Sequence, residues 1–380
     1  MKDSRTSGWI KPVICRGRKP QSKNRWRADV IMYLYWQDLI IALLMVVIVL
    51  VFWLTGAALT TLAERRLSAF IQDRLGPNRV GPQGLLQPMA DFLKLVFKEE
   101  LVTRRGDKIV FLLAPAIILI PAFMLFAIIP FGDKIVIAGK EVVLQIANLD
   151  FGILYIFAIA SLGVYGIVLG SWASNNKYAL FGGLRASAQM ISYEITLGLS
   201  VVGIILVAGS LKLPDIVAQQ QQMLWDFIPR WNVWTQPLSF FLFITAAFAE
   251  TNRLPFDLAE AEQELVAGYH TEYSGMKFAL FFLSEYMNLI TSAALITTLF
   301  FGGWHLPWID QIAMPNWLLQ LLQVCAFVVK TVIFVVMFIW VRWTLPRFKY
   351  NQLMSIGWKI LLPVAIINIL VISVIVAYFN

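Results

Sequence analysis

The sequence is poor in charge, in cysteine and in histidine. Only 14% of its 380 residues are charged, whereas 59% are apolar, and it has 2 cysteines and 2 histidines. Cys15 and Cys325 are too few and too far apart for a disulfide framework or a thiolate metal site. His270 and His305 lie in different loops and supply no haem ligand pair, and no phosphate loop, nucleophile elbow or zinc spacing occurs. The chain therefore carries no soluble catalytic domain of its own.

The sequence consists largely of long apolar runs. The mean hydropathy is +0.72, far above that of soluble domains. About 20 helical residues cross a bilayer core of roughly 30 Å. The pattern predicts an all-α polytopic transmembrane bundle of about eight helices. They are expected near residues 39–62, 109–130, 151–171, 188–210, 233–250, 278–302, 317–341 and 360–379.

The basic residues predict the orientation of the bundle. Loops after the odd-numbered helices hold 17 Lys and Arg, and the opposite loops hold 4. The positive-inside rule therefore puts the first set in the cytoplasm and both termini on the outer side of the membrane.

The first 31 residues contradict that orientation, because they carry nine Lys or Arg. They have no convincing signal-peptide cleavage site. We expect residues 1–31 to be a disordered extension or a start-site artefact, with Met32 as the natural start, and residues 32–380 to form one integral membrane domain.

The first cytoplasmic loop contains an amphipathic pattern after Pro88. Met89, Phe92, Val96 and neighbouring apolar residues share one helical face. The pattern predicts a helix lying in the membrane interface, although an ordinary surface linker fits the pattern as well. On the opposite side, the glutamine run 219–222 reads as a solvated spacer.

Three charged residues interrupt predicted spans: Glu194, Glu285 and Lys330. Ionised groups at such depth face the bundle interior or a wet cavity and often mark a proton route, although a structural hydrogen bond is the alternative for each acid. Lys330 is equally well explained as a counter-ion of Glu194 or Glu285 and as a relay group.

A stretch dense in carboxylates follows the fifth helix. Residues 249–285 contain seven acids and two basic residues. Like charges this close raise one another's pKa values, so the acids are expected to titrate as a group. A solvated acidic loop is the alternative, but the apolar residues mixed among the acids favour a loop packed against the bundle.

Four long segments resemble one membrane subunit of bacterial NADH:quinone oxidoreductase (respiratory complex I), the H-type subunit, which is the counterpart of mitochondrial complex I subunit 1. The resemblance covers about residues 34–378. The segments are "ERRLSAFIQDRLGPNRVGPQGLLQPMADFLKLVFKE", "SNNKYALFGGLRASAQMISYEITLG", "AETNRLPFDLAEAEQELVAGYHTEYSGMKFALFFLSEY" and "LPRFKYNQLMSIGWK". In some relatives a carboxylate stands where this chain has Ser161.

The resemblance implies a membrane subunit that forms the quinone tunnel and an acidic path toward the antiporter-like subunits. The implied quinone-binding residues are Arg65, Asp91, Phe92, Arg253 and Phe256. The acidic residues of the path, which Lys330 is expected to join as a relay group, are Glu194, Glu250, Asp257, Glu260, Glu262, Glu264, Glu272 and Glu285.

The resemblance also implies partners and cofactors. Ubiquinone or menaquinone is the substrate, and FMN, iron–sulfur clusters and NADH lie on partner subunits only, because this chain offers no ligands for them. The expected partners are the hydrophilic subunits of the quinone site, small membrane subunits and the lipid bilayer, with no nucleic acid. Two alternatives remain open: a stand-alone cation/proton carrier and a purely structural membrane anchor.

Overall fold

The computed structural model describes residues 36–103, 106–137, 140–224, 229–259, 262–307 and 315–379. The expectation for residues 1–31 lies outside this part. The chain divides into two units, Met1–Met45 and Val46–Asn380, and the second unit contains the helix packing that positions the site.

Helices dominate the described residues. They are α2 (Trp36–Ile71), α3 (Gln87–Phe97), α4 (Lys108–Phe126), α5 (Gly152–Ala173), α6 (Lys177–Ala208), α7 (Leu213–Gln220), α8 (Asn232–Thr235), α9 (Pro237–Glu250), α10 (Glu262–Leu265), α11 (Gly275–Phe300), α12 (Asn316–Thr344), α13 (Tyr350–Ser355) and α14 (Leu362–Phe379). A π-helical segment, Ile356–Leu361, joins α13 to α14. The two strands, β1 (Lys134–Ile137) and β2 (Lys140–Val143), form an antiparallel hairpin.

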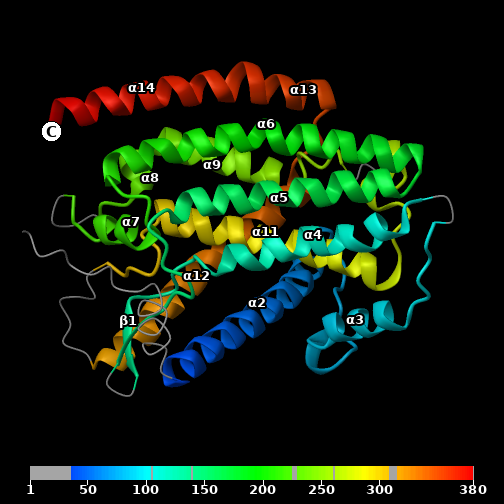
Figure 1. Cartoon of the computed structure of the whole chain (residues 1–380), viewed down its shortest axis with the longest axis horizontal. Coiled ribbons are helices and arrows are strands. Elements are labelled where there is room, and N and C mark those ends of the chain that lie inside the picture. Colours follow the sequence, from blue (N-terminus) through cyan, green and yellow to red (C-terminus); the bar gives the residue numbers. More distant parts are fainter. Residues whose placement is uncertain are drawn as a thin grey trace, which may run out of the picture. The chain divides into compact units, whose positions relative to one another are not determined.

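The long helices pack as neighbours in a continuous series. Helix α14 lies on α6, α6 on α5 and α9, α5 on α4, α4 on α11, and α11 on α12. Figure 1 shows α14, α6, α5 and α4 following one another in this order. Among the long apolar helices, α11 is the most enclosed, because 61% of its most apolar stretch is buried inside the bundle. The helix that carries Glu285 therefore runs through the protein interior rather than along its lipid-facing surface.

Seven of the described helices are long and apolar enough to cross a membrane. The all-α polytopic bundle predicted from hydropathy is confirmed. The predicted fifth span is shorter than expected, because α9 has only 14 residues. The spans predicted at 39–62 and 188–210 are longer, since α2 continues to Ile71 and α6 begins at Lys177. The charge-free criterion made both spans too short, because α2 continues through Glu64 and Arg65 and α6 includes Lys177 and Arg185.

Local capping explains several helix ends. The Asp107 side chain accepts hydrogen bonds from the backbone N–H groups of Ile109 and Val110 at the start of α4, and Asn176 accepts from Tyr178 at the start of α6. Helix α6 ends at Gly209, whose φ of 66° is the left-handed conformation favoured by glycine. The amphipathic helix expected after Pro88 is present as α3, and its apolar side chains are exposed within this chain.

The glutamine run 219–222 is not the solvated spacer predicted from composition. Gln220 is 1% exposed, and its side chain donates to Thr298 O at 3.0 Å and accepts from Gly302 N at 2.9 Å. It ties α7 to the end of α11. The four glutamines differ in burial, but because they are identical the sequence does not indicate which of them faces the core.

A close approach between α6 and the acidic loop generates the first prediction. A Cβ on Gly182 would lie 2.7 Å from the backbone carbon of Gly268. Gly182→Val is expected to push the loop away at a cost of about 1–3 kcal/mol, and the thermal denaturation midpoint of the purified protein measures it. Gly163→Ala is the control, because a Cβ on Gly163 meets nothing within 4 Å. Equal midpoints for the two variants would refute the close packing.

Candidate functional site

A buried guanidinium lies at the centre of the charged residues. Arg253, in the loop after α9, is 2% exposed. Its Nη1 lies 2.8 Å from Glu64 Oε2 on α2, and its Nε lies 2.7 Å from Glu285 Oε1 on α11. The guanidinium also stacks over the ring of Tyr286, with 4.5 Å between Cζ and the centroid. One side chain therefore joins two helices and a loop that are far apart in sequence.

Two further groups complete this cluster around Glu64. The Tyr286 hydroxyl donates to Glu64 Oε2 at 2.6 Å. Arg342 on α12 donates from Nη1 to Glu64 Oε1. Arg253 Nη2 has no hydrogen-bond partner among the described residues. Arginine carries five N–H donors. The guanidinium therefore keeps a buried N–H group from which a ligand oxygen or a water could accept a hydrogen bond.

The loop that carries Arg253 is held down by a second ion pair. Arg347 Nη2 lies 3.0 Å from Asp257 Oδ2, and Phe348 N donates to Pro255 O at 3.1 Å. The ring of Phe256 lies 5.5 Å from that of Phe348. Burial raises the pKa of Asp257 to about 6, with Arg347 opposing the shift and Glu285 adding to it. The Asp257 carboxyl is therefore expected to change its charge near pH 6.

An internal cavity of about 60 Å³ lies beside the cluster. Its apolar wall comes from α4, α5 and α6, and its polar wall comes mainly from α11 and from the end of α9. The polar lining residues are Glu250, Thr251, Asn252, Ser284, Glu285, Asn288, Thr291 and Ser292. A water needs about 10–15 Å³ of such space and two to four polar partners, so the cavity has room for about four waters. Two carboxylates therefore face one chamber that can hold water.

Glu194 extends the acidic groups from Glu250 toward α5. Its carboxylate accepts a hydrogen bond from the Ser161 hydroxyl on α5, and it lies within electrostatic range of Glu250. Met190 and Leu197, one turn away on either side of Glu194, line the cavity. Glu194 consequently lies on the helical face of α6 that is turned to this chamber.

Two further acids of the loop, Glu264 and Glu272, lie nearer the surface. Glu264 accepts from Arg185 at 2.6 Å and is 59% exposed. Glu272 accepts from Asn176 Nδ2 at 2.7 Å. Glu262 begins the short helix α10, and nothing further is described of its side chain, while Glu260 lies outside the described residues. The structure thus groups Glu194, Glu250 and Glu285 at the cavity.

The predicted quinone-binding residues fall into two places. Arg65 on α2 lies 2.5 Å from Asp91 on α3, and Phe92 beside it is 46% exposed. Arg253 and Phe256 are buried in the loop at the inner cluster. Helix α2 connects the two places, because Glu64 faces the buried cluster and the next residue, Arg65, faces α3.

Lys330 on α12 lies away from the acids. Its ammonium donates to the backbone oxygens of Phe301 at 2.8 Å, Gly303 at 3.1 Å and His305 at 2.7 Å. The counter-ion of Glu285 is Arg253, not Lys330. Membership of Lys330 in a proton relay stays a prediction from the sequence.

Sequence reasoning missed Glu64, Arg342 and Arg347. The predicted first span ended at residue 62, which left Glu64 in a loop, whereas helix α2 carries it into the bundle. The arginines that pair with the acids lie outside residues 249–285, so counting charges in that stretch overstated like-charge repulsion. Glu264, for example, has its own arginine partner near the surface. That these acids titrate as a group stays a prediction.

Comparisons with known proteins show which proteins this chain is similar to. A family model described as NADH dehydrogenase matches residues 43–373. The NADH-quinone oxidoreductase H-type subunit 1 of Geobacter metallireducens is 50% identical, over 88% of this chain and 96% of its own length. NADH-quinone oxidoreductase subunit 8 of Rhodothermus marinus is 50% identical over 91% and 99%. The H-type subunit 1 of Cytophaga hutchinsonii is 48% identical over 83% and 90%.

The buried cluster predicts a large effect of removing its arginine. Arg253→Met leaves two buried carboxylates without their shared partner, which is expected to cost about 3–5 kcal/mol. Adding Glu285→Gln should recover part of that loss, because it removes one of the uncompensated charges. Thermal denaturation of the purified protein measures both. Arg185→Met is the matched surface control, with an expected cost of about 0–1 kcal/mol; an equal loss there would contradict the cluster's role.

Asp257 predicts a pH dependence with a defined sign. Its folded pKa of about 6 lies above its ordinary value of 3.8, so the folded state binds this proton more tightly than the unfolded state. The resulting stability is present below about pH 4 and is lost as the pH rises through about 6. Infrared titration should show a protonated carboxyl band that grows as the pH falls through about 6. The part of the band that titrates near pH 6 should be lost in Asp257→Asn and retained in Glu264→Gln; survival of that part in Asp257→Asn would refute the assignment.

Proposed function

This chain belongs to the NADH dehydrogenase family as an H-type subunit of NADH-quinone oxidoreductase, and from that premise we propose that it forms the quinone tunnel and the first part of the proton path. It is a multi-pass membrane subunit of an enzyme complex. We further propose that electrons come from cofactors on partner subunits, and that both chain termini lie on the periplasmic side.

The quinone part of the proposal rests on α3 and on Arg253. Helix α3 exposes an apolar face, with Met89 and Phe97 among its exposed residues, which suits the isoprenoid tail of a quinone. The Arg65–Asp91 pair stands where α2 meets α3. Deeper in the chain, the unpartnered Nη2 of Arg253 suits a carbonyl oxygen of the head group. These residues offer an apolar entrance and a polar inner end.

The proton part rests on the cavity. Reduction of a quinone takes up two protons, and the charge change occurs beside Arg253. Because Arg253 also holds Glu64 and Glu285, a ligand that draws on the same guanidinium alters the field at both acids. Glu285 lines the chamber that Glu250 also faces, and Glu194 lies next to Glu250. The single observation that carries the proposal is this contact between a buried ion cluster and a chamber with two acids.

The loop acids Glu260, Glu262, Glu264 and Glu272, together with Asp257, are proposed to feed this path. Two other functions make different predictions. A carrier that works alone would transport cations when purified by itself. A structural anchor would leave turnover and pumping independent of the acids, so variants of the cavity distinguish it from a proton path.

Glu250→Gln should lower quinone-coupled proton pumping on the order of tenfold or more in the assembled complex, because it removes an exchangeable proton without removing an ion-pair partner. Gly163→Leu should do the same by filling the chamber, since Gly163 lines it and faces open space. Pumping is measured with a pH dye in liposomes that contain the whole complex. Gly163→Ala is the size control, and full pumping in both test variants would refute the proton path.

A further inference from the structure

The ammonium of Lys330 occupies a cage of backbone oxygens at the end of α11. Three carbonyl oxygens, of Phe301, Gly303 and His305, accept from its Nζ. The protonated amine has three N–H donors, one for each carbonyl oxygen, so this geometry suits the charged form. The negative end of the α11 dipole favours the charge further, and Nζ lies 4.8 Å from the ring centroid of Trp231. A fixed positive charge therefore stands at the end of α11 that is remote from the acidic loop.

A layer of phenylalanines separates this charge from the cavity. On α11 the cavity reaches as far as Leu295, about 9 Å of helix rise before Phe301. The rings of Phe243 and Phe300 lie 5.5 Å apart, those of Phe240 and Phe300 lie 5.4 Å apart, and those of Phe301 and Phe334 lie 4.9 Å apart. We call Phe240, Phe243, Phe300, Phe301 and Phe334 the phenylalanine layer.

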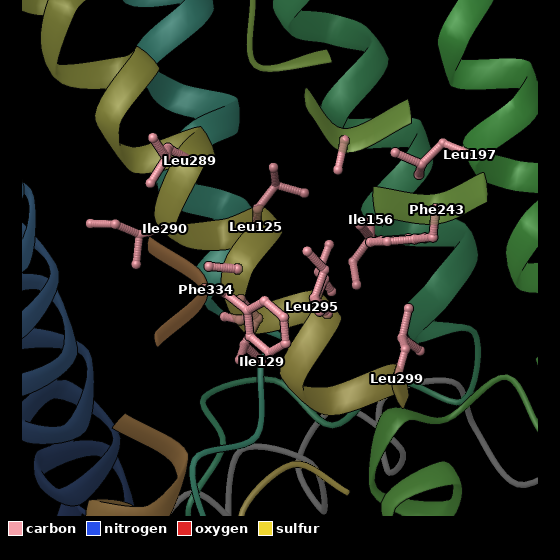
Figure 2. Packing of buried hydrophobic residues seen from close by; sticks show 14 of the residues in the cluster. Leu125, Ile129, Ile156, Leu197, Phe243, Leu289, Ile290, Leu295, Leu299 and Phe334 are labelled. Carbon is pink, nitrogen blue, oxygen red and sulfur yellow. The ribbon is translucent and has the colours of Figure 1, made fainter. Parts of the chain in front are cut away.

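The phenylalanine layer is continuous with the apolar core. Figure 2 shows Phe334, Leu295 and Ile129 gathered beside α11, with Leu299 further along the same helix. Phe334 is one helical turn from Lys330, on the same face of α12. The ring of Phe301 belongs to the layer, and its carbonyl oxygen belongs to the cage. The layer and the charge are therefore parts of one arrangement.

The threonine hydroxyl groups of α11 in this region form hydrogen bonds within their own helix. Thr297 Oγ1 donates to Ala293 O at 3.0 Å, and Thr298 Oγ1 donates to Ala294 O at 2.8 Å. Both residues are fully buried. Their protons are committed to backbone oxygens, so they do not bridge the layer as a chain of donors and acceptors.

We propose that the phenylalanine layer and the caged Lys330 ammonium together form a proton barrier that closes the cavity at the end remote from the acidic loop. The layer excludes water, and the fixed charge repels any hydronium that enters, as positive groups do in pores that exclude cations. Protons in the chamber are thereby confined to exchange among Glu250, Glu285 and Glu194. The inference rests on the proposed proton-conducting role of the cavity.

Passive proton leak through liposomes containing the whole complex tests the barrier without NADH, so the readout does not depend on turnover. Lys330→Gln keeps two N–H donors for the carbonyl cage and removes the charge, and Lys330→Arg keeps the charge. We expect a leak about fivefold or more above the parent for Lys330→Gln and a parent-like leak for Lys330→Arg. Assembly is checked by the flavin content and subunit stoichiometry of each preparation.

A double variant tests whether the added proton leak passes through the cavity. Combining Lys330→Gln with Gly163→Leu should abolish the added leak, because the second substitution fills the chamber. An unchanged leak in assembled Lys330→Gln overturns the barrier, and so does a leak that Gly163→Leu leaves in place. Should Lys330→Gln fail to assemble, Phe334→Ser opens the layer from the same helix and is read in the same way. Failure of the proton path itself is separate, since it appears as full pumping in both Glu250→Gln and Gly163→Leu.

Discussion

The guanidinium of Arg253 is the interaction on which the arrangement of this site depends. It brings Glu64 from α2 and Glu285 from α11 to one point, and it does so from a loop. Removing charges from water is costly, and apolar residues of equal volume would hold these helices together as well. The stability of the bundle therefore does not explain the cluster. What the charges add is a fixed geometry: the loop cannot move without separating buried opposite charges.

The surroundings of the side chains of helix α11 change along its length. Near its start, Lys277 pairs with Glu100 at 3.0 Å. Glu285 then meets Arg253, and the following polar residues line the cavity. Beyond Leu295 the cavity ends, and apolar side chains dominate as far as the carbonyl cage of Lys330. A single helix thus passes from ion pairs to a wet chamber and then to a dry layer, because each successive turn faces a different neighbour.

Hydropathy was sufficient to predict the bundle, and helical periodicity was sufficient to predict α3, because both signals are local. Glu194 and Glu285 were also found from sequence, since a charge inside an apolar run is conspicuous, whereas Glu64 was not. The partners were not found. Glu64 and Arg342 are separated by 278 positions, and no local pattern relates them. Gln220 was misread for the same reason, as its burial is set by α11 rather than by its neighbours in the run.

Arginine stays protonated in proteins, so Arg253 cannot itself exchange a proton. It can only redistribute its donors. Nη1 serves Glu64, Nε faces Glu285, and Nη2 is open among the described residues. A ligand oxygen at Nη2 would share one positive charge with both acids and so weaken its hold on each. Binding at one edge of the guanidinium is then felt at the cavity through Glu285, without any long-range movement of helices. The rigid fork of a single side chain is enough to link a binding event to the acids that face water.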